Sequence, residues 1–578
     1  MGNAEAASRK VRDRLIQSVD AGRLDEHVRA LSKWDRLTGE PGAEMAVDYI
    51  MDQLSTYGIT GERHRLDMFC SDPIYGEVQV TAPETFTVRA KSRSFCGHFP
   101  EGVCGDVIYD RHSQGALLSS REEEVWISSF KDKIVLSWNY YEDYVQKLEQ
   151  AGAKGLIHIW PTAEEYIHEE TVGPIWGTPT PENAPSLPKI PVVGVTNGDG
   201  RKLLALAEKV DVLTVSVKTE LQTSVKTASL PVAVIPGQTE EFLLLSGHYD
   251  SWHLGATDNA VGNALCLEVA RAFAPLAGKL KRGIKIAWWP GHSNARYAGS
   301  AWYCDHQWQE LQQHCVAHIN VDFPGTQGGI NIVPRSTGME DPAFLQEIVT
   351  ELTGEPPRKW AFMPRGADQS FWGVDIPIHL GIKYEPAEGT TICAPGCAGG
   401  WWWHTEGDTY DKVDVNLLHR DTKLHVAMLH EIAERESLPI QIDRFLQKAM
   451  LLLEELDDHS AEEFSFGPIY QAIEQLRQKW QESAALLASA RPDAYRRVSK
   501  RVGGGLNRLM FSYSSPYDYD HTFPFKPFPG LHSVKDTYRS NTAAATFLFR
   551  QTRFVRQRNR LVQELHLLTA MIDSARET

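Results

Sequence analysis

One histidine and two aspartates follow the pattern of a buried strand at short intervals. The apolar run Phe242-Leu-Leu-Leu-Ser-Gly ends at His248, and Asp250 and Asp258 come next in a glycine-containing stretch. Imidazole and carboxylate groups at the carboxyl end of a strand are ligands that zinc and similar metals take in proteins. The spacing therefore predicts one part of a metal site, to which distant segments must add ligands.

Two later segments offer such ligands. Asp322 follows the apolar run 316–321, and His404 follows three consecutive tryptophans. A single histidine or aspartate at a strand end is often only a capping residue, so the prediction depends on all four side chains converging.

Strand and helix patterns alternate regularly after residue 227, which predicts an α/β sheet with helices on both faces. Ligands gather at the carboxyl ends of strands in such sheets, where His248 and Asp322 would stand. The predicted strands are 232–235, 242–245, 283–288, 316–321 and 376–380, and the predicted helices are 263–274, 298–313, 343–353, 368–372 and 415–437.

The flanking parts of the chain have different patterns. Residues 7–57 show helical periodicity twice, and residues 78–217 hold short β-rich segments with one helix at 144–153. The Pro-rich segment 160–188 is expected to be an exposed loop. From residue 442 the pattern is helical, with an aromatic stretch at 511–531 that predicts either a subunit interface or a cap on a monomer.

The motifs together resemble peptidase family M28, a family of zinc exopeptidases. His248-x-Asp-Ser, Gly255-Ala-x-Asp-Asn-Ala-x-Gly, Asn320-x-Asp and His404-Thr-x-x-Asp-Thr-x-Asp-Lys-Val occur in that family's order and spacing. With its flanking segments, the chain is most similar to the glutamate carboxypeptidase II and transferrin receptor branch. The resemblance implies a catalytic domain over 1–74 and 227–437, a protease-associated-like insert over 75–226, and a helical dimerisation domain over 438–578.

The resemblance also implies a role for each candidate ligand. His248 and Asp322 would hold one metal ion, His404 would hold a second, and Asp258 would bridge the two. Asp250 would orient His248 through its other ring nitrogen.

One part of the family pattern is absent. The family has two consecutive glutamates shortly before Gly299-Ser300, the first as general base and the second as a metal ligand, but Ser293 and Asn294 stand there. A serine hydroxyl has no pKa suited to accepting a proton, and asparagine brings no charge to a metal. The loss of a carboxylate weakens the second metal most, because two divalent ions close together repel strongly.

We therefore predict one firm metal site, and a second that is weak, absent or rebuilt from His404 and Asn294. His253 or His292 could help to rebuild it, because imidazole binds transition metals well, although either could also be an ordinary hydrogen-bonding residue. The predicted catalytic residues are His292, Ser293 and Asp250, and the predicted ligands of the firm site are His248, Asp258 and Asp322.

Three residues are candidates for binding substrate. Arg296 and Arg365 could each pair with a substrate carboxylate or form an ordinary salt bridge. Trp403, next to His404, would wall the site with an aromatic surface. Asp368, in Gly-Ala-Asp-Gln-Ser-Phe, matches a family segment that packs beside the site.

Three functions are compatible with these residues. The first is a metal-dependent hydrolase of a small amide or peptide-like substrate, with a non-standard base. The second is a metal-dependent lyase or other non-hydrolytic enzyme on the same site, since such a step needs a Lewis acid but no glutamate base. The third is an inactive dimeric binding protein whose peptidase site has decayed.

The amino-acid composition limits the binding partners and the cellular location that can be expected. The formal net charge of -16 argues against nucleic acid or an anionic membrane as the main partner. A cytoplasmic location is expected, because the sequence has no apolar leader segment and no long apolar run. Eight scattered cysteines suggest reduced thiols, and Cys393 and Cys397 could close a loop, hold a metal or flank a plain turn.

Overall fold

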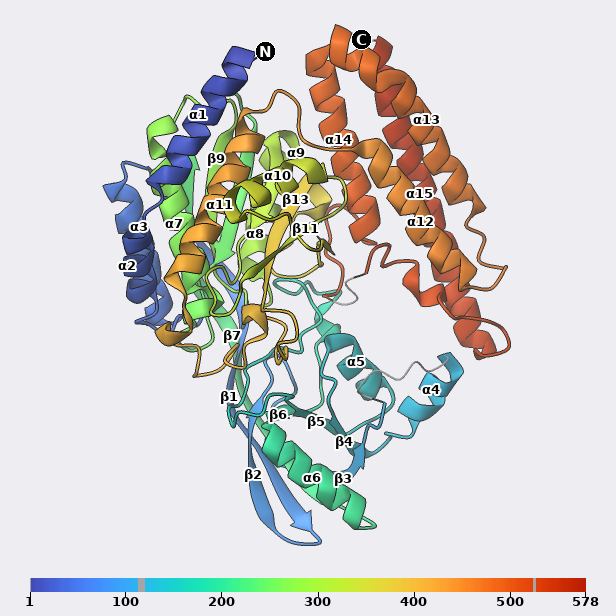
Figure 1. Ribbon diagram of the computed structural model, residues 1–578. Helices are drawn as coiled ribbons and strands as arrows, with labels where there is room; N and C mark the ends of the chain where they lie inside the picture. The colour runs from blue at the N-terminus through green and yellow to red at the C-terminus, as the bar shows by residue number, and fades with distance from the viewer. Residues whose placement is uncertain (1, 113–119, 523–525, 578) are drawn as a thin grey trace.

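The computed structural model describes residues 2–112, 120–522 and 526–577 (Figure 1). Its strands form one sheet in the order β1-β2-β6-β5-β4-β3-β7-β9-β8-β10-β13-β11-β12. Their bounds are β1 Gly61–Ala82, β2 Phe86–Ser92, β3 Phe99–Tyr109, β4 Lys133–Ser137, β5 Gly155–Ile159, β6 Val192–Val195, β7 Thr214–Ile235, β8 Phe242–His248, β9 Gly283–Trp289, β10 Cys315–Asn320, β11 Asn331–Ser336, β12 Ala361–Phe362 and β13 Ile378–Glu385.

Helices cover this sheet and extend beyond it. Their bounds are α1 Gly2–Ser18, α2 Ala21–Leu31, α3 Pro41–Thr56, α4 Ser120–Ser128, α5 Glu142–Gln150, α6 Asn197–Lys209, α7 Val261–Phe273, α8 Ala298–His306, α9 Trp308–His314, α10 Pro342–Thr353, α11 Val415–Glu434, α12 Ile442–Asp458, α13 Gly467–Ala490, α14 Pro492–Phe511 and α15 Ala544–Glu577. Among the helices described, none is long and apolar enough to cross a bilayer.

Strand β8 lies at the centre of the half of the sheet that carries the candidate ligands. It runs parallel to β9 and β10, and β10 runs parallel to β13. Leu243 and Leu245 pack into a core with α2, α7 and α11, while Phe242 and Leu244 pack on the other face with α8 and α9. The predicted α/β sheet with helices on both faces is therefore confirmed.

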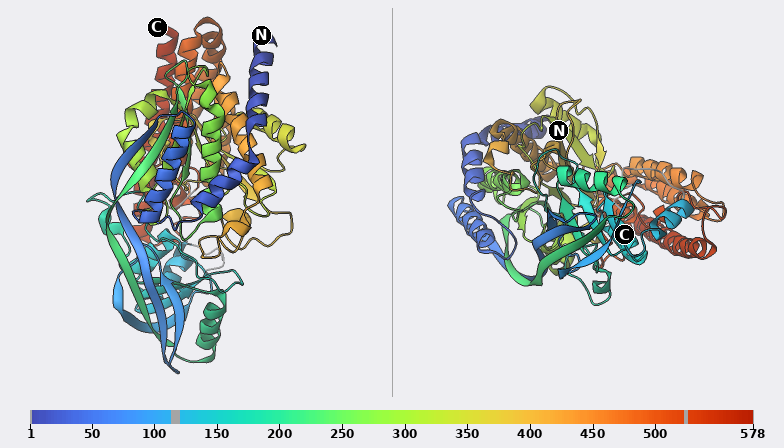
Figure 2. Two further views of the ribbon diagram at one scale, coloured as in Figure 1. Left: turned by 90° about the vertical axis from the view of Figure 1, so that its left-hand side faces the viewer. Right: turned by 90° about the horizontal axis from the view of Figure 1, so that it is seen from below.

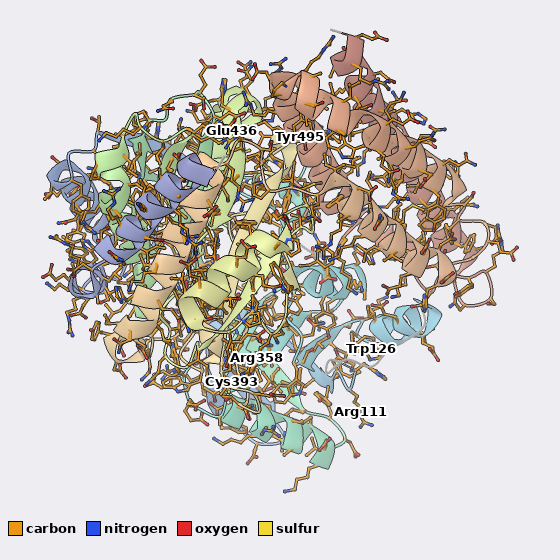
Figure 3. All side chains as sticks on the ribbon, turned by 45° about the horizontal axis from the view of Figure 1, so that its top comes forward. Arg111, Trp126, Arg358, Cys393, Glu436 and Tyr495 are labelled. Atoms are coloured by element: carbon orange, nitrogen blue, oxygen red, sulfur yellow. The ribbon has the colours of Figure 1, made fainter. Side chains whose placement is uncertain are left out.

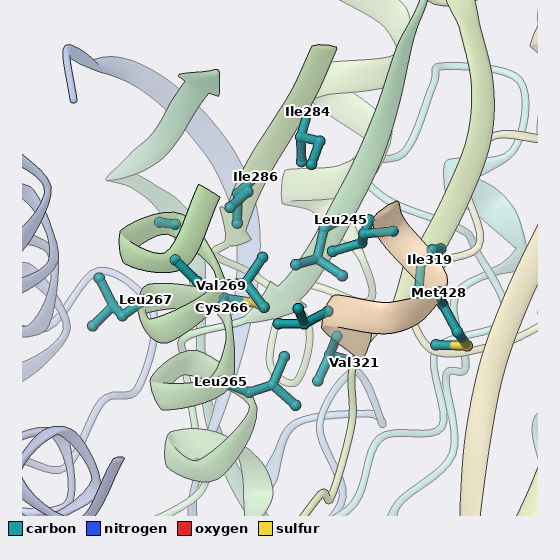
Figure 4. Close-up of a cluster of buried hydrophobic side chains, with 14 of the residues drawn as sticks. Leu245, Leu265, Cys266, Leu267, Val269, Ile284, Ile286, Ile319, Val321 and Met428 are labelled. Carbon is teal, nitrogen blue, oxygen red and sulfur yellow. The ribbon is translucent and has the colours of Figure 1, made fainter. Parts of the chain in front are cut away.

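The core beneath α7 and α11 fixes the strand that ends in His248. Figure 4 shows Leu245 among Leu265 and Val269 of α7, Ile286 of β9 and Met428 of α11. These side chains are fully buried, so a shift of β8 along its axis would open a cavity in a close-packed interior. The position of His248 is thus set by packing several residues away from it.

Two long strands connect this half of the sheet with the β-rich insert. β1 and β7 pair antiparallel from Gly61 with Ala233 to Ala82 with Thr214, and Figure 2 shows them as one ribbon along the side of the molecule. The predicted boundaries at 74/75 and 226/227 fall inside these strands. The two parts are therefore connected by the continuous paired strands β1 and β7 rather than by a flexible linker.

The C-terminal helices α12 to α15 form a bundle at the right of Figure 1, and its apolar core also includes Met339, Met363 and Trp372 of the preceding part of the chain. Glu436, just after α11, lies 3.5 Å from Arg496 of α14, close to where Figure 3 labels Glu436 and Tyr495. Arg365 forms a buried ion pair with Asp520 at 2.7 Å. The bundle therefore meets the rest of the chain through a shared apolar core as well as through charged contacts.

Two predicted helices differ from the observed structure. The predicted helix 298–313 is two helices, α8 and α9, because the backbone of Gln307 leaves helical geometry. The predicted helix 368–372 is wrong. Ala367 and Asp368 have φ angles of 51° and 60°, in the left-handed region, and the segment is a series of turns.

A buried carboxyl group before α10 makes stability depend on pH. Glu340 is 2% exposed and accepts hydrogen bonds from the backbone N–H groups of Thr337 and His379. Burial raises the pKa of Glu340 to about 7. A carboxyl group whose pKa is higher in the folded than in the unfolded state stabilises the fold when it is protonated. This stabilisation is lost as the pH rises from the pKa of the group in the unfolded chain to about 7.

We expect Glu340→Gln to remove that pH dependence. Relative to the variant, the free energy of unfolding of the wild-type protein should fall by up to about 3 kcal/mol between pH 4.5 and 7.5. Urea unfolding of both proteins across this range measures the difference. Parallel curves would show that Glu340 does not titrate with a raised pKa.

Candidate metal centre

Three of the predicted ligands converge at the carboxyl ends of β8 and β10. His248 is the last residue of β8, Asp322 lies just past β10, and Asp258 lies in the turn before α7. The Nε2 atom of His248 is 3.1 Å from Oδ1 of Asp258 and 3.5 Å from Oδ1 of Asp322. One ligand atom from each residue lies within 4.8 Å of the others.

The atoms that face one another in this cluster have no other role. Nε2 of His248 and the Oδ1 atoms of Asp258 and Asp322 are buried, and none has a hydrogen-bond partner among the described residues. Buried polar atoms are normally satisfied, because leaving them unpaired costs free energy. One imidazole nitrogen and two carboxylate oxygens around one point fit a divalent ion such as zinc.

His404 lies on the other side of Asp258. Its Nε2 atom is 3.0 Å from Oδ2 of Asp258, whereas His248 faces Oδ1 of the same carboxylate. The Asp258 carboxylate therefore stands between two imidazoles, which is the arrangement of a bridging ligand. The three-residue cluster found among the described residues does not include His404, so this second position has fewer ligands.

Electrostatics in the centre favour bound positive charge. Burial lowers the pKa of His404, but hydrogen bonds and charges from Asp258 and Glu170 raise it to about 10. Burial likewise lowers the pKa of His248, and the neighbouring carboxylates of Asp250, Asp258 and Asp322 raise it well above its ordinary value. The carboxylates thus stabilise a cation at the point where the two Nε2 atoms meet Asp258.

Asp250 supports the loop around His248. Nδ1 of His248 is 2.9 Å from the main-chain oxygen of Asp250 and 3.5 Å from its carboxylate. That carboxylate accepts hydrogen bonds from the Thr38 hydroxyl and from the backbone N–H groups of His292 and Ser293. Asp250 therefore connects the first ligand with the segment that departs from the family pattern.

Two buried residues for which no role was predicted hold the Asp258 loop. Asp408 accepts hydrogen bonds from the backbone N–H and hydroxyl of Thr257 and from the N–H of Asp258. Arg36, which is fully buried, donates to the main-chain oxygens of Tyr249, Leu254 and Gly255. Asp408 lies in the His404 motif, but the role of Arg36 has no pattern in the sequence.

His292, Ser293 and Asn294 take three different positions. The ring of His292 stacks on His248 with centroids 3.8 Å apart, and its Nδ1 lies 2.7 Å from Oδ2 of the buried Asp368. Ser293 is 5% exposed beside Asp250. The Asn294 side-chain amide donates to Asp72 at 2.7 Å, and its oxygen is buried without a partner among the described residues.

The predicted substrate-binding residues lie in different surroundings. Trp403 stacks on the His404 ring with centroids 3.8 Å apart. Arg296 pairs with Glu142 of α5 in the insert, and Arg365 pairs with Asp520. Either guanidinium would have to leave its carboxylate partner to bind a substrate carboxylate.

The segment 160–188 is not the exposed loop that was predicted. His168, Glu169 and Glu170 are all nearly buried, and Nδ1 of His404 lies 3.0 Å from the main-chain oxygen of Glu169. His253 also faces this loop, with Nε2 3.6 Å from Oε1 of Glu169. Proline content suggested solvent exposure, but part of the loop packs against the metal centre.

Cys393 and Cys397 are free thiols. Cys397 is buried, with its sulfur 3.0 Å from the Thr257 hydroxyl, and Cys393 is partly exposed (Figure 3). The cysteine pair therefore neither closes a loop nor joins the cluster of His248, Asp258 and Asp322.

The histidine and aspartate centre lies at the carboxyl ends of the parallel strands β8 and β10, within a mixed sheet that has helices on both faces. Residues 232–429 match the model of peptidase family M28. The match contains all four residues around the candidate centre.

Known proteins are similar to parts of the chain in sequence or in fold. Carboxypeptidase Q of Rattus norvegicus is 23% identical over 261 residues, which cover 44% of this chain and 52% of the relative. The chain thus spans about half the length of the curated relatives of this kind that it matches. An aminopeptidase from Aneurinibacillus sp. strain AM-1 has a TM-score of 0.56 at 20% identity, covering 74% of this chain and 98% of that one. The zinc aminopeptidase BSAP of Bacillus subtilis has a TM-score of 0.54 at 17% identity, covering 72% and 96%.

Proposed function

We propose that this protein is a metal-dependent hydrolase of the M28 type that cleaves a small amide or peptide-like substrate. The observation that carries the proposal is the set of three buried, otherwise unpartnered atoms of His248, Asp258 and Asp322 within 4.8 Å. The match of residues 232–429 to the M28 family model and the fold shared with a zinc aminopeptidase support zinc as the metal.

The two halves of the centre are proposed to bind metal unequally. His248, Asp258 and Asp322 form the firm site. His404 shares only Asp258 with it, and Asn294 offers a neutral oxygen where the family has a carboxylate. A bound divalent ion would act as a Lewis acid that polarises the scissile carbonyl. Two tightly bound metals per chain would contradict this unequal arrangement.

His292 is proposed to take over the proton transfer that the missing glutamate performs. Its Nδ1 is held by Asp368, whose other oxygen accepts a hydrogen bond from the Ser300 hydroxyl at 2.7 Å. A carboxylate that fixes one ring nitrogen sets the tautomer and leaves Nε2 to accept or donate a proton. The stacked position on His248 keeps that ring beside the metal ligands.

The walls of the centre suggest what could enter. Trp403 covers the His404 ring, and Phe323, next to Asp322, belongs to the same apolar cluster as Trp160 and Tyr140 of the insert. Aromatic walls favour an apolar or ring-containing group in the substrate. We propose that the insert and the segment before His404 together enclose that group.

The decisive experiment compares turnover by the wild-type protein and Asp258→Asn. Zinc-loaded protein is incubated with pooled dipeptides, acylated amino acids and aryl amides. Hydrolysis that the variant loses supports the proposal. Metal binding with elimination or hydration products in place of hydrolysis supports a lyase or another non-hydrolytic enzyme. Neither metal nor turnover supports the inactive binding protein.

A homodimer through the C-terminal bundle is a second part of the proposal. Leu548 and Phe549 of α15 are 56% and 70% exposed, and Leu451 of α12 is 66% exposed. Large apolar side chains that gather on an exposed surface are typical of association surfaces. Sedimentation at micromolar concentration should give twice the 64.9 kDa chain mass, and a monomer would contradict it.

A further inference from the structure

The missing carboxylate at Asn294 leaves the second half of the centre short of negative charge. Among the described residues of the catalytic part, Asp258 is the carboxylate that faces Nε2 of His404, and its other oxygen faces the firm site. The Asn294 amide is tied to Asp72 and carries no charge. A second cation would therefore be held weakly unless another part of the protein adds anions near it.

The insert brings two carboxyl groups to this place. Glu169 and Glu170 are 5% and 6% exposed. Nδ1 of His404, the ring nitrogen that points away from Asp258, lies 3.0 Å from the main-chain oxygen of Glu169 and 3.5 Å from a carboxylate oxygen of Glu170. The main-chain N–H of Glu169 donates to the oxygen of His404 at 2.8 Å. His404 is therefore fixed from the insert on both its backbone and its ring.

The Glu169 carboxylate has one oxygen that is not engaged. Its Oε1 lies 3.2 Å from Nζ of Lys91 and 3.6 Å from Nε2 of His253. Its Oε2 is buried without a hydrogen-bond partner among the described residues. A buried oxygen left without a partner costs free energy, and Lys91 faces only the other oxygen of this carboxylate, so Oε2 remains available to a cation.

The loop that carries both glutamates is itself held rigidly. Arg93, which is fully buried, donates to the main-chain oxygen of His168 and lies 3.1 Å from Nδ1 of His158. The His168 ring stacks on Trp160 with centroids 3.9 Å apart. These contacts place Glu169 and Glu170 with little freedom, as a supporting shell for a metal ligand must be placed.

We propose that the insert completes the second half of the metal centre, with Glu170 as a positioning residue for His404 and with Glu169 and Glu170 supplying the negative charge that Asn294 lacks. The inference rests on the proposed function, because it concerns the residue that positions His404, one of the proposed metal ligands. It makes the insert part of the catalytic machinery rather than only a wall of the cleft.

The test is a Zn²⁺ titration of metal-stripped protein by calorimetry, repeated with Co²⁺ and visible absorption. The proteins are wild type, His404→Ala, Glu170→Gln and Glu165→Gln. Glu165 lies in the same loop but is exposed, so its variant makes the same change in charge away from the centre. We expect Glu170→Gln to weaken the binding event that His404→Ala removes by about 10- to 100-fold. Glu165→Gln should bind as the wild type does.

The outcomes separate this inference from the proposed function. If Glu170→Gln changes no binding event by more than twofold, or if Glu165→Gln weakens binding as much as Glu170→Gln, the role of Glu170 is wrong while the metal site stands. A wild-type protein that binds neither ion would overturn the proposed function together with this inference. Thermal unfolding of each metal-free variant checks that the insert stays folded, and a loss of affinity in a variant with unchanged melting temperature supports the proposal.

Discussion

Replacing His292 with alanine is expected to lower kcat by about 10²- to 10⁴-fold, the usual contribution of a positioned acid or base. Bound metal should stay unchanged, because the His292 ring stacks on His248 but is not among the three clustered ligands. Asp368→Asn should lower kcat in the same direction, since its carboxylate fixes Nδ1 of His292 at 2.7 Å. Steady-state kinetics with metal analysis of each variant measure both effects.

A matched control is available in His306→Ala. His306 is exposed and stacks on Trp302, away from the centre. Its variant should keep the wild-type kcat. Wild-type kcat in His292→Ala would rule out His292 as the proton acceptor and would direct attention to His253, whose ring faces Glu169.

Removing the metal should abolish turnover while leaving the fold intact. A Lewis acid stabilises the transition state by several kcal/mol. Protein from which a chelator has removed the metal should therefore lose about 10³-fold or more in kcat/KM. The packed core on both faces of β8 does not depend on the metal, so the circular dichroism spectrum should persist. Added zinc should restore activity to the wild-type protein but not to Asp322→Ala, which lacks one of the three clustered ligands. Activity that survives complete chelation would contradict a metal-dependent mechanism.

The central part of the site could be predicted from residue type and spacing. His248 and Asp322 stand at the ends of apolar runs long enough to be buried strands, and parallel strands bring their carboxyl ends together. Asp258 follows within the same short loop. Local pattern and sheet geometry were enough to bring these three side chains to one place.

The supporting residues could not be predicted, because their roles come from contacts between distant segments. Arg36 and Glu170 look like ordinary surface charges in the sequence, yet both are buried against the centre. The pairing of Arg365 with Asp520 joins segments far apart in the chain, so a salt bridge and a substrate contact were equally plausible. Asp368 has left-handed backbone geometry, which is incompatible with the helix predicted to begin there. This geometry brings the Asp368 carboxylate to Nδ1 of His292, and the residue types in the segment do not predict it.

The most direct test of the metal centre is elemental analysis of wild-type protein and Asp258→Asn, both purified without added metal. We expect about one equivalent of zinc per chain in the wild type, held by His248, Asp258 and Asp322, and its loss in the variant, which removes the carboxylate between the two imidazoles. A wild-type protein free of metal, or a variant that retains the same amount, would contradict the account.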